Sequence, residues 1–431
     1  AFADTNSGTG RYVGNISYNH SNNQMDFQTN GAGRMTVDSS GNVGIGTSSP
    51  SSKLDVNGDA TINSLTVGRG SGDLSTNTAV GNDALNANTS GANNVATGSF
   101  ALLQNTTGSS NTACGRSALD SNTTGNNNTA TGRDALVLNT TGSNNTANGY
   151  DCLRSNTTGN YNTATGINAL RTNTTGDENV AIGKDALRSN TTGNQNTAVG
   201  FAAHRSNTTG THNTAFGNNA LYSNTTANSN VAIGDAALYS NTTGNYNVAN
   251  GQNALYANTT GQRNTSNGYN ALYSNTTGSY NTAIGMQALV NSTTASQNTA
   301  TGYYSLGQNI TGSDNTANGY SALYNNTTGN ENVSTGYNSL LSNTTGGYNV
   351  AYGARALYSN TTANNNVAVG YFALYSNTTG HSNAALGSSA LRTNTTGIHN
   401  TAAGINALYT NTTGTQNVAV GIQTLMTNTT G

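Results

Sequence analysis

An asparagine recurs every 17 residues from Asn77 to Asn417, without insertion or deletion, so the chain carries 21 copies of one unit. Numbered from that asparagine, the unit reads N-[TV]-A-x-G-x-x-A-L-x-x-N-T-T-G-x-x. A surface loop tolerates changes in length, whereas a stack in which identical positions align does not. The constant period therefore predicts a solenoid or a fibre, in which every copy occupies the same place in the stack.

Three positions of the unit are nearly invariant, and we expect them to hold the fold. They are Gly at position five, Leu at nine and Asn at twelve, represented by Gly81, Gly234, Gly421, Leu85, Leu238, Asn88 and Asn241. Position nine fails once, at His204, and position twelve fails once, at Ser292. Gly at position fifteen is replaced only by Ala227, Ala295 and Ala363. We expect the asparagines to form a hydrogen-bonded ladder, and the fifth glycine to need either a positive φ or a close backbone approach.

Composition within the unit favours β-structure over paired helices. Each segment is shorter than a stable helix, Gly interrupts positions five and fifteen, and Thr, Asn and Val are mediocre helix formers. We expect one short strand at positions one to five and a second at eight to thirteen, joined by turns. The predicted fold class is all-β, a β-solenoid or fibrous shaft with 17-residue coils. Strands stacked across the axis, or running along it in a triple spiral, both fit this pattern.

Alternation along the two expected strands assigns their faces. Ala at three, Leu at nine, the small residue at eleven and Thr at thirteen should point inward, which makes a thin core. Positions two, four and ten should point outward. The Thr/Val face at positions two and four is too flat and β-branched to be left unpaired on 21 coils. We therefore predict that it packs against two other copies of the chain in a homotrimer.

The composition excludes several classes of protein. Charged residues make up 7% of the chain and the formal net charge is −2, so there is no basic surface for nucleic acid or for anionic lipid. No apolar run is long enough to insert into a membrane. With 22 tyrosines and a single proline, the chain is expected to be ordered. Ordinary enzyme scaffolds do not have this composition.

Outside the repeats, residues 1–38 read as a small β-rich N-terminal segment, 39–76 as a linker or short shaft segment, and 77–431 as the shaft. The segment 39–58, SSGNVGIGTSSPSSKLDVNG, closely resembles a linker found in tail fibre proteins of bacteriophages. Repeats such as NTAIGMQAL at 281–289 resemble that family too. A weaker similarity links the N-x-A-x-G element to the heads of trimeric autotransporter adhesins.

The resemblance to tail fibres implies a homotrimeric, extracellular fibre on a virion tail, with other virion proteins and cell-surface glycans as partners. It also implies a C-terminal chaperone domain that is removed after assembly. The sequence ends at Gly431, position fifteen of the last copy, and we expect that domain, or a distal receptor-binding tip, to lie outside this chain. The alternative is a cellular surface adhesin or a secreted filament subunit. A remote alternative is an ice-binding solenoid, although Phe216, Tyr352 and Leu386 would interrupt its flat threonine array.

Catalytic, cofactor and metal sites are not expected. The five histidines fall at scattered repeat positions, so no Ser/His/Asp set can be assembled, and the repeat lacks the periodic Asp of calcium-binding solenoids. Cys114 and Cys152 occupy coils two apart, which is beyond the reach of a disulfide in a stack. We predict two free thiols and no enzymatic activity.

Specificity should reside at the variable tenth position. It holds tyrosine in four successive coils, at Tyr222, Tyr239, Tyr256 and Tyr273, and arginine in the four before them, at Arg154, Arg171, Arg188 and Arg205. A tyrosine column stabilises a β-stack, and it also offers ring faces to neutral sugars. The arginine column places like charges close together, so either nearby acids such as Asp151 and Asp185 or a bound anionic glycan should compensate it.

Overall fold

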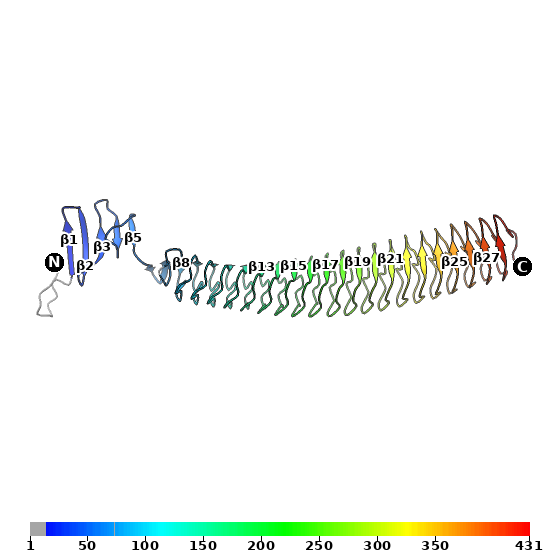
Figure 1. The fold of residues 1–431 in the computed structure, drawn as a ribbon, viewed down its shortest axis with the longest axis horizontal. Helices are drawn as coiled ribbons and strands as arrows, with labels where there is room; N and C mark the ends of the chain where they lie inside the picture. The colour runs from blue at the N-terminus through cyan, green and yellow to red at the C-terminus, as the bar shows by residue number, and fades with distance from the viewer. Residues whose placement is uncertain (1–13, 73) are drawn as a thin grey trace. The chain divides into compact units, whose positions relative to one another are not determined.

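The structure is a computed structural model that describes residues 14–72 and 74–431. Its secondary structure is β-strand and turn, and the described part of the chain contains no helix that could cross a membrane. The chain divides into two compact units, Ala1–Thr158 and Gly159–Gly431. Both contain 17-residue coils of a β-solenoid, which confirms the predicted fold class (Figure 1).

The first unit contains the irregular strands and the first coils. Its strands are β1 (Gly14–Asn19), β2 (Gln24–Thr29), β3 (Ala32–Val37), β4 (Val43–Ile45), β5 (Leu54–Val56), β6 (Ala60–Ile62), β7 (Leu65–Gly68), β8 (Thr78–Gly81), β9 (Val95–Thr97), β10 (Thr112–Cys114), β11 (Thr129–Thr131) and β12 (Thr146–Asn148). Strands β1 to β5 form one sheet. Strand β7 pairs antiparallel with both β6 and β8, and the parallel pairing of the coils begins with β8 and β9.

The predicted segment boundaries do not coincide with breaks in strand pairing. Strand β3 pairs with β4 across residue 38, and β7 pairs with β8 across residue 76. Strands on the two sides of each boundary therefore pair with each other, in two separate sheets, and the division into 1–38, 39–76 and 77–431 stays a prediction based on the repeat pattern alone.

The sheet of β1 to β5 has one apolar and one polar face. Residues directly opposite each other in neighbouring strands lie on the same face of the sheet. On one of the two faces, every such pair consists of two apolar residues. The side chains on that face are Ile16, Tyr18, Met25, Phe27, Met35, Val37, Val43, Ile45, Leu54 and Val56. None of these ten is buried by the residues that the structure describes.

The second unit consists of coils throughout. Its strands are β13 (Thr163–Thr165), β14 (Val180–Ile182), β15 (Thr197–Val199), β16 (Thr214–Phe216), β17 (Val231–Ile233), β18 (Val248–Asn250), β19 (Thr265–Asn267), β20 (Thr282–Ile284), β21 (Thr299–Thr301), β22 (Thr316–Asn318), β23 (Val333–Thr335), β24 (Val350–Tyr352), β25 (Val367–Val369), β26 (Ala384–Leu386), β27 (Thr401–Ala403) and β28 (Val418–Val420). Each strand pairs in parallel with the next, and every residue pairs with the residue 17 positions later. The strands thus stack across the axis of the unit.

The predicted first strand is confirmed at positions two to four, but the predicted second strand is wrong. Positions six to eleven form turns, in which the seventh and ninth residues take positive φ, as at Ala236 (53°) and Leu238 (54°). An extended strand would alternate its side chains between two faces, whereas here consecutive residues, Ala237 and Leu238, are both buried. Alternation therefore misassigned the eleventh and thirteenth positions, which are half-buried and not core.

Hydrogen bonds between coils also continue through the turns. The Leu238 amide donates to the Ala254 carbonyl of the next coil (2.9 Å), and the Ala236 amide donates to Asn218 of the preceding one (2.9 Å). Left-handed backbone is unfavourable for residues such as leucine, by about 1 kcal/mol or more each. Stacking compensates because it satisfies these amides and buries the leucine side chain.

Buried asparagines connect the coils from inside, as predicted for position twelve. Asn241 Nδ2 donates to Asn224 Oδ1 of the preceding coil (3.1 Å) and to the Gly244 carbonyl of its own coil (2.9 Å). The asparagine at position one also bonds both to the carbonyl at position fifteen and to a neighbouring coil. Asn230 Nδ2 reaches the same Gly244 carbonyl (3.0 Å), and its Oδ1 accepts the Asn247 amide of the next coil (2.9 Å). Two side-chain ladders therefore meet at position fifteen.

The ladder at position twelve is interrupted inside the stack at Ser292, and it ends at Asn411, whose Oδ1 has no hydrogen-bond partner. Ser292 is fully buried, and its Oγ and the Oδ1 of Asn275 in the preceding coil both lack a hydrogen-bond partner. On the other side, Asn309 Nδ2 donates to the Gly312 carbonyl (2.8 Å). Serine is too short to reach the neighbouring amides, so the coil 281–297 has an incomplete inner ladder.

Glycine at position five is required for both of the expected reasons. Gly234 has a φ of 127°, and a Cβ at this residue would lie 2.6 Å from the backbone carbon and oxygen of Gly251 in the next coil. Position fifteen is equally crowded, but its φ is not positive, and three coils carry alanine there.

The alanine coils show what that crowding costs. The backbone amide at position thirteen donates a hydrogen bond to the carbonyl at position thirteen of the next coil. This bond is 2.9 Å long at Thr208 but 3.2 Å at Thr225, two residues before Ala227. At position fourteen, the backbone amide of Thr209 donates to the Thr225 carbonyl (3.2 Å), whereas in the described structure the amide of Thr226 makes no such bond. The coils with Ala295 and Ala363 show the same lengthening, to 3.1 Å.

We predict that Gly234→Ala destabilises its coil by at least about 2 kcal/mol, because it adds backbone strain to the overlap. Gly244→Ala, at position fifteen, should cost about 1 kcal/mol, the worth of one lost hydrogen bond. Limited proteolysis followed by mass spectrometry should find a new cleavage site near residue 234 in the first variant and little change in the second. Equal resistance of both variants would contradict the need for a positive φ.

Candidate contact site

The tyrosine column at position ten is a stack of rings. Tyr222, Tyr239, Tyr256 and Tyr273 lie with ring centroids 5.1 to 5.2 Å apart and planes within 8° to 9° of parallel. Each side chain is half-buried, since its neighbours cover the ring faces. Inside the column a sugar ring has no free face to stack on. A glycan contact at these residues stays a prediction, and it would have to use the hydroxyl edges.

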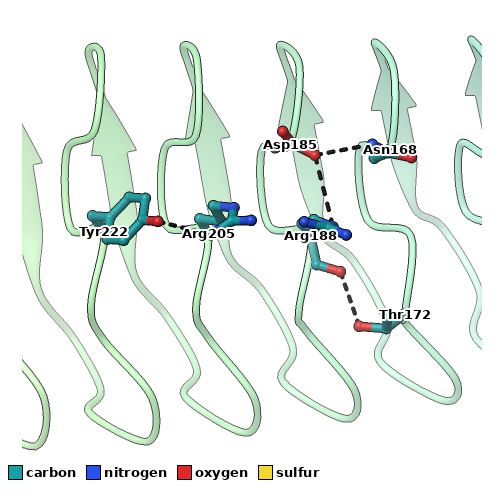
Figure 2. Close-up of polar contacts among 6 residues, drawn as sticks. All are labelled: Asn168, Thr172, Asp185, Arg188, Arg205 and Tyr222. Atoms are coloured by element: carbon teal, nitrogen blue, oxygen red, sulfur yellow. Dashed lines mark hydrogen bonds and ion pairs between the residues drawn. The ribbon is translucent and has the colours of Figure 1, made fainter.

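The arginines before this column have partners within the chain. In the first unit, Arg154 Nε lies 3.5 Å from Asp151 Oδ1. In the second, Arg188 Nε lies 3.7 Å from Asp185 Oδ1, which also accepts a hydrogen bond from Asn168 Nδ2 (3.0 Å), as Figure 2 shows. The acids therefore compensate these arginines as the sequence suggested. A bound anion is not needed to explain either one.

Two further contacts anchor the arginine column of the second unit to its neighbours. Arg205 donates from Nη1 to the Tyr222 hydroxyl (2.7 Å), and its guanidinium carbon lies 5.6 Å from the centroid of that ring (Figure 2). Thr172 Oγ1 donates to the backbone carbonyl of Arg188 (2.9 Å). Arg171 occupies the same position one coil before Arg188. The candidate residues are thus built into the stack, and their assignment as a contact site stays a prediction.

A more exposed stripe lies at position six, which the sequence reading did not single out. Five successive coils carry a large apolar residue there, and all five side chains are exposed: Tyr269, Met286, Tyr303, Tyr320 and Tyr337. Tyr303 and Tyr320 stack at 5.1 Å. The signal in the sequence was the unbroken run of five large apolar residues, because elsewhere position six holds polar and charged residues and no more than two large apolar residues in a row.

The N-terminal sheet carries a polar hollow on its other face. It is lined by Gln24, Asp26, Gln28 and Thr36, together with residues of the turn after β4. Asp26 Oδ1 accepts hydrogen bonds from Gln24 Nε2 (2.8 Å) and Thr36 Oγ1 (2.7 Å). Across the described residues 14–72 and 74–431, no three His, Cys, Asp or Glu side chains come together as a metal site.

Neither cysteine forms a disulfide, as predicted. Cys114 is exposed, and Cys152 is buried beside the backbone of its coil. Burial raises the pKa of the Cys152 thiol to about 12, against a smaller opposing effect of a backbone hydrogen bond from Asn148. The inner thiol is therefore unreactive at neutral pH, and it acts as a small apolar residue at position eight.

Comparisons of this chain with family models, with curated proteins and with solved structures find no match.

His204 takes the place of leucine in the core of its coil. It is fully buried, its Nδ1 has no hydrogen-bond partner, and its Nε2 lies 3.0 Å from Asn224 Nδ2. That contact draws Asn224 away from the ladder, since its bond to Asn207 Oδ1 lengthens to 3.3 Å, compared with 2.7 Å one coil earlier. Burial lowers the pKa of His204 to about 3.

We predict that the coil around His204 loses stability as the pH falls from about 6.5 towards about 3. The unfolded chain binds a proton on this imidazole below about pH 6.5, whereas the folded coil excludes it until near pH 3. Hydrogen exchange of peptides covering 196–212, corrected for intrinsic rates, should be faster at pH 4.5 than at pH 7.5. His204→Leu should abolish that difference, while a change at the exposed His212 should preserve it. A pH effect that survives in His204→Leu would contradict this assignment.

Proposed function

We propose that this chain is the shaft of a structural and adhesive extracellular fibre, and that a phage tail fibre is its setting. The observation that carries the proposal is the arrangement of constant and variable positions. The constant residues pack in the core of each coil or bond one coil to the next, whereas varied side chains lie at positions four and six, which are mostly exposed, and at position ten, which is half-buried in most coils. Such a stack suits rigid extension and many weak surface contacts. No enzymatic role is proposed.

Self-association is proposed because two apolar surfaces lack a cover within the described chain. The ten apolar side chains on one face of the β1 to β5 sheet have no layer packed on them, and a single sheet cannot bury its apolar face alone. In the coils, the strand face carries Ile182, Ile233 and Ile284, which are 42%, 41% and 42% exposed. Surfaces of this kind mark association sites. Trimerisation would cover each surface with its counterparts in the other two copies.

We predict that the combined changes Ile182→Asp, Ile233→Asp and Ile284→Asp dissociate the assembly, because they place carboxylates in a dry interface. The unmodified protein should have the mass of three chains in native mass spectrometry or light scattering, and the variant that of one.

The matched control places aspartate on the exposed corner of the same three coils, with Thr192→Asp, Thr243→Asp and Thr294→Asp. It adds the same charge and should stay trimeric. A monomeric mass for the unmodified protein would contradict the proposed trimer, and dissociation of the corner variant would place the interface elsewhere.

The setting can be tested separately from the assembly. A cellular surface adhesin or secreted filament subunit could be built from the same coils, so mass spectrometry of purified virions and of cell surfaces from the same source distinguishes the two. For an ice-binding solenoid, the strand face would have to be flat. Phe216, Tyr352 and Leu386 stand exposed on it, so we expect no thermal hysteresis.

A further inference from the structure

The last hundred residues of the chain contain no carboxylate side chain. The last acidic residue is Glu331, whereas Arg355 and Arg392 lie beyond it. This differs from the coils that hold Arg154 and Arg188, where each arginine has an aspartate three residues before it. Any compensation of these two later charges by an acid therefore has to come from outside this stretch of chain.

Arg355 and Arg392 converge on one aromatic ring. The guanidinium carbons of Arg355 and Arg392 lie 5.5 Å and 4.7 Å from the ring centroid of Phe372. These residues come from three successive coils, at positions seven, seven and ten. The two charges on this ring are alike, and the ring attracts each of them only weakly. An anion that contacts both guanidinium groups would offset the repulsion between them.

The surroundings suit a sugar that carries the anion. Tyr371 packs edge-on against Phe372 with ring centroids 4.2 Å apart, and its side chain is 54% exposed, so it can offer a surface to a pyranose ring. The Tyr409 hydroxyl accepts a hydrogen bond from Arg392 Nη1 (2.7 Å) and fixes that guanidinium. In the next coil, positions six and seven hold small residues, Ser388 and Ser389, beside the cluster.

We propose that Arg355, Tyr371, Phe372 and Arg392 form a binding site for an acidic saccharide, one that carries a carboxylate or a sulfate. The guanidinium groups bind the oxyanion, and the aromatic edge supports the sugar ring. The proposal rests on the proposed function, in which the coils present a contact surface. It moves the anion-binding role from Arg154, Arg171, Arg188 and Arg205 to a part of the chain where no acid competes.

The test uses calorimetric titration of the full chain with three oligosaccharides of equal length: a polyuronate, a sulfated heparin fragment and a neutral maltooligosaccharide. We expect one or both acidic probes to bind and the neutral probe not to bind. The polyuronate and heparin arms then distinguish carboxylate from sulfate recognition. Arg355→Gln combined with Arg392→Gln should weaken binding at least tenfold. Failure of both acidic probes to bind, or equal binding of the neutral one, would overturn the site.

The matched control combines Arg188→Gln with Arg263→Gln, which removes the same charge elsewhere on the second unit and should leave the affinity within twofold. An equal loss in both double variants would mean nonspecific charge attraction, and would overturn the site. Hydrogen exchange of the unmodified protein avoids any effect of the substitutions on folding. The acidic probe should protect peptides covering 351–358 and 388–395, and protection elsewhere would overturn the assignment. The oligomer mass, measured in parallel, tests the proposed fibre independently.

Discussion

The rest of the structure depends on hydrogen bonding along the axis of each stack. Every coil presents its buried asparagine amides to the coil before it and after it, and both ladders also use the carbonyl at position fifteen, as Asn230 and Asn241 do at Gly244. A coil one residue longer or shorter would leave these buried groups unpaired, at about 1–3 kcal/mol each. This accounts for a period of 17 residues without a single slip. It also explains why a core of alanine and one leucine per coil suffices.

The sequence determined more of the fold than of the contact surface. The period and the asparagine ladder followed from constancy, and the inward Ala at three followed from alternation along the first strand. Leu at nine was also placed inward correctly, although the strand used to place it does not form. The second strand did not, because a residue such as Leu238 carries no sequence signal for positive φ, and only the stack makes that backbone favourable. Asn at position one marked the repeat, yet its bonds to neighbouring coils depend on geometry that the spacing does not contain.

The candidate site was harder to predict, for a related reason. Tyr222 and its neighbours occupy a variable outward position, but stacking at 5.1 Å turns their ring faces towards one another and away from ligands. For Arg188 the sequence left open whether Asp185 or a bound anion compensates its charge, and the structure places Asp185 Oδ1 3.7 Å from Arg188 Nε. The convergence of Arg355 and Arg392 on Phe372 joins two different columns, positions seven and ten, so no single column of the sequence reveals it.

The most direct test of the axial ladder is to repair its interruption at Ser292. Ser292→Asn would supply an amide to the unpaired Asn275 Oδ1 and an acceptor for Asn309, and the account predicts a gain of about 1–3 kcal/mol. In the unmodified protein, the backbone amides of the coil 281–297 should be among the least protected from hydrogen exchange of all interior coils. In the variant, their protection should rise to the level of the neighbouring coils. Unchanged or faster exchange in Ser292→Asn would contradict the claim that the buried asparagines hold the coils together.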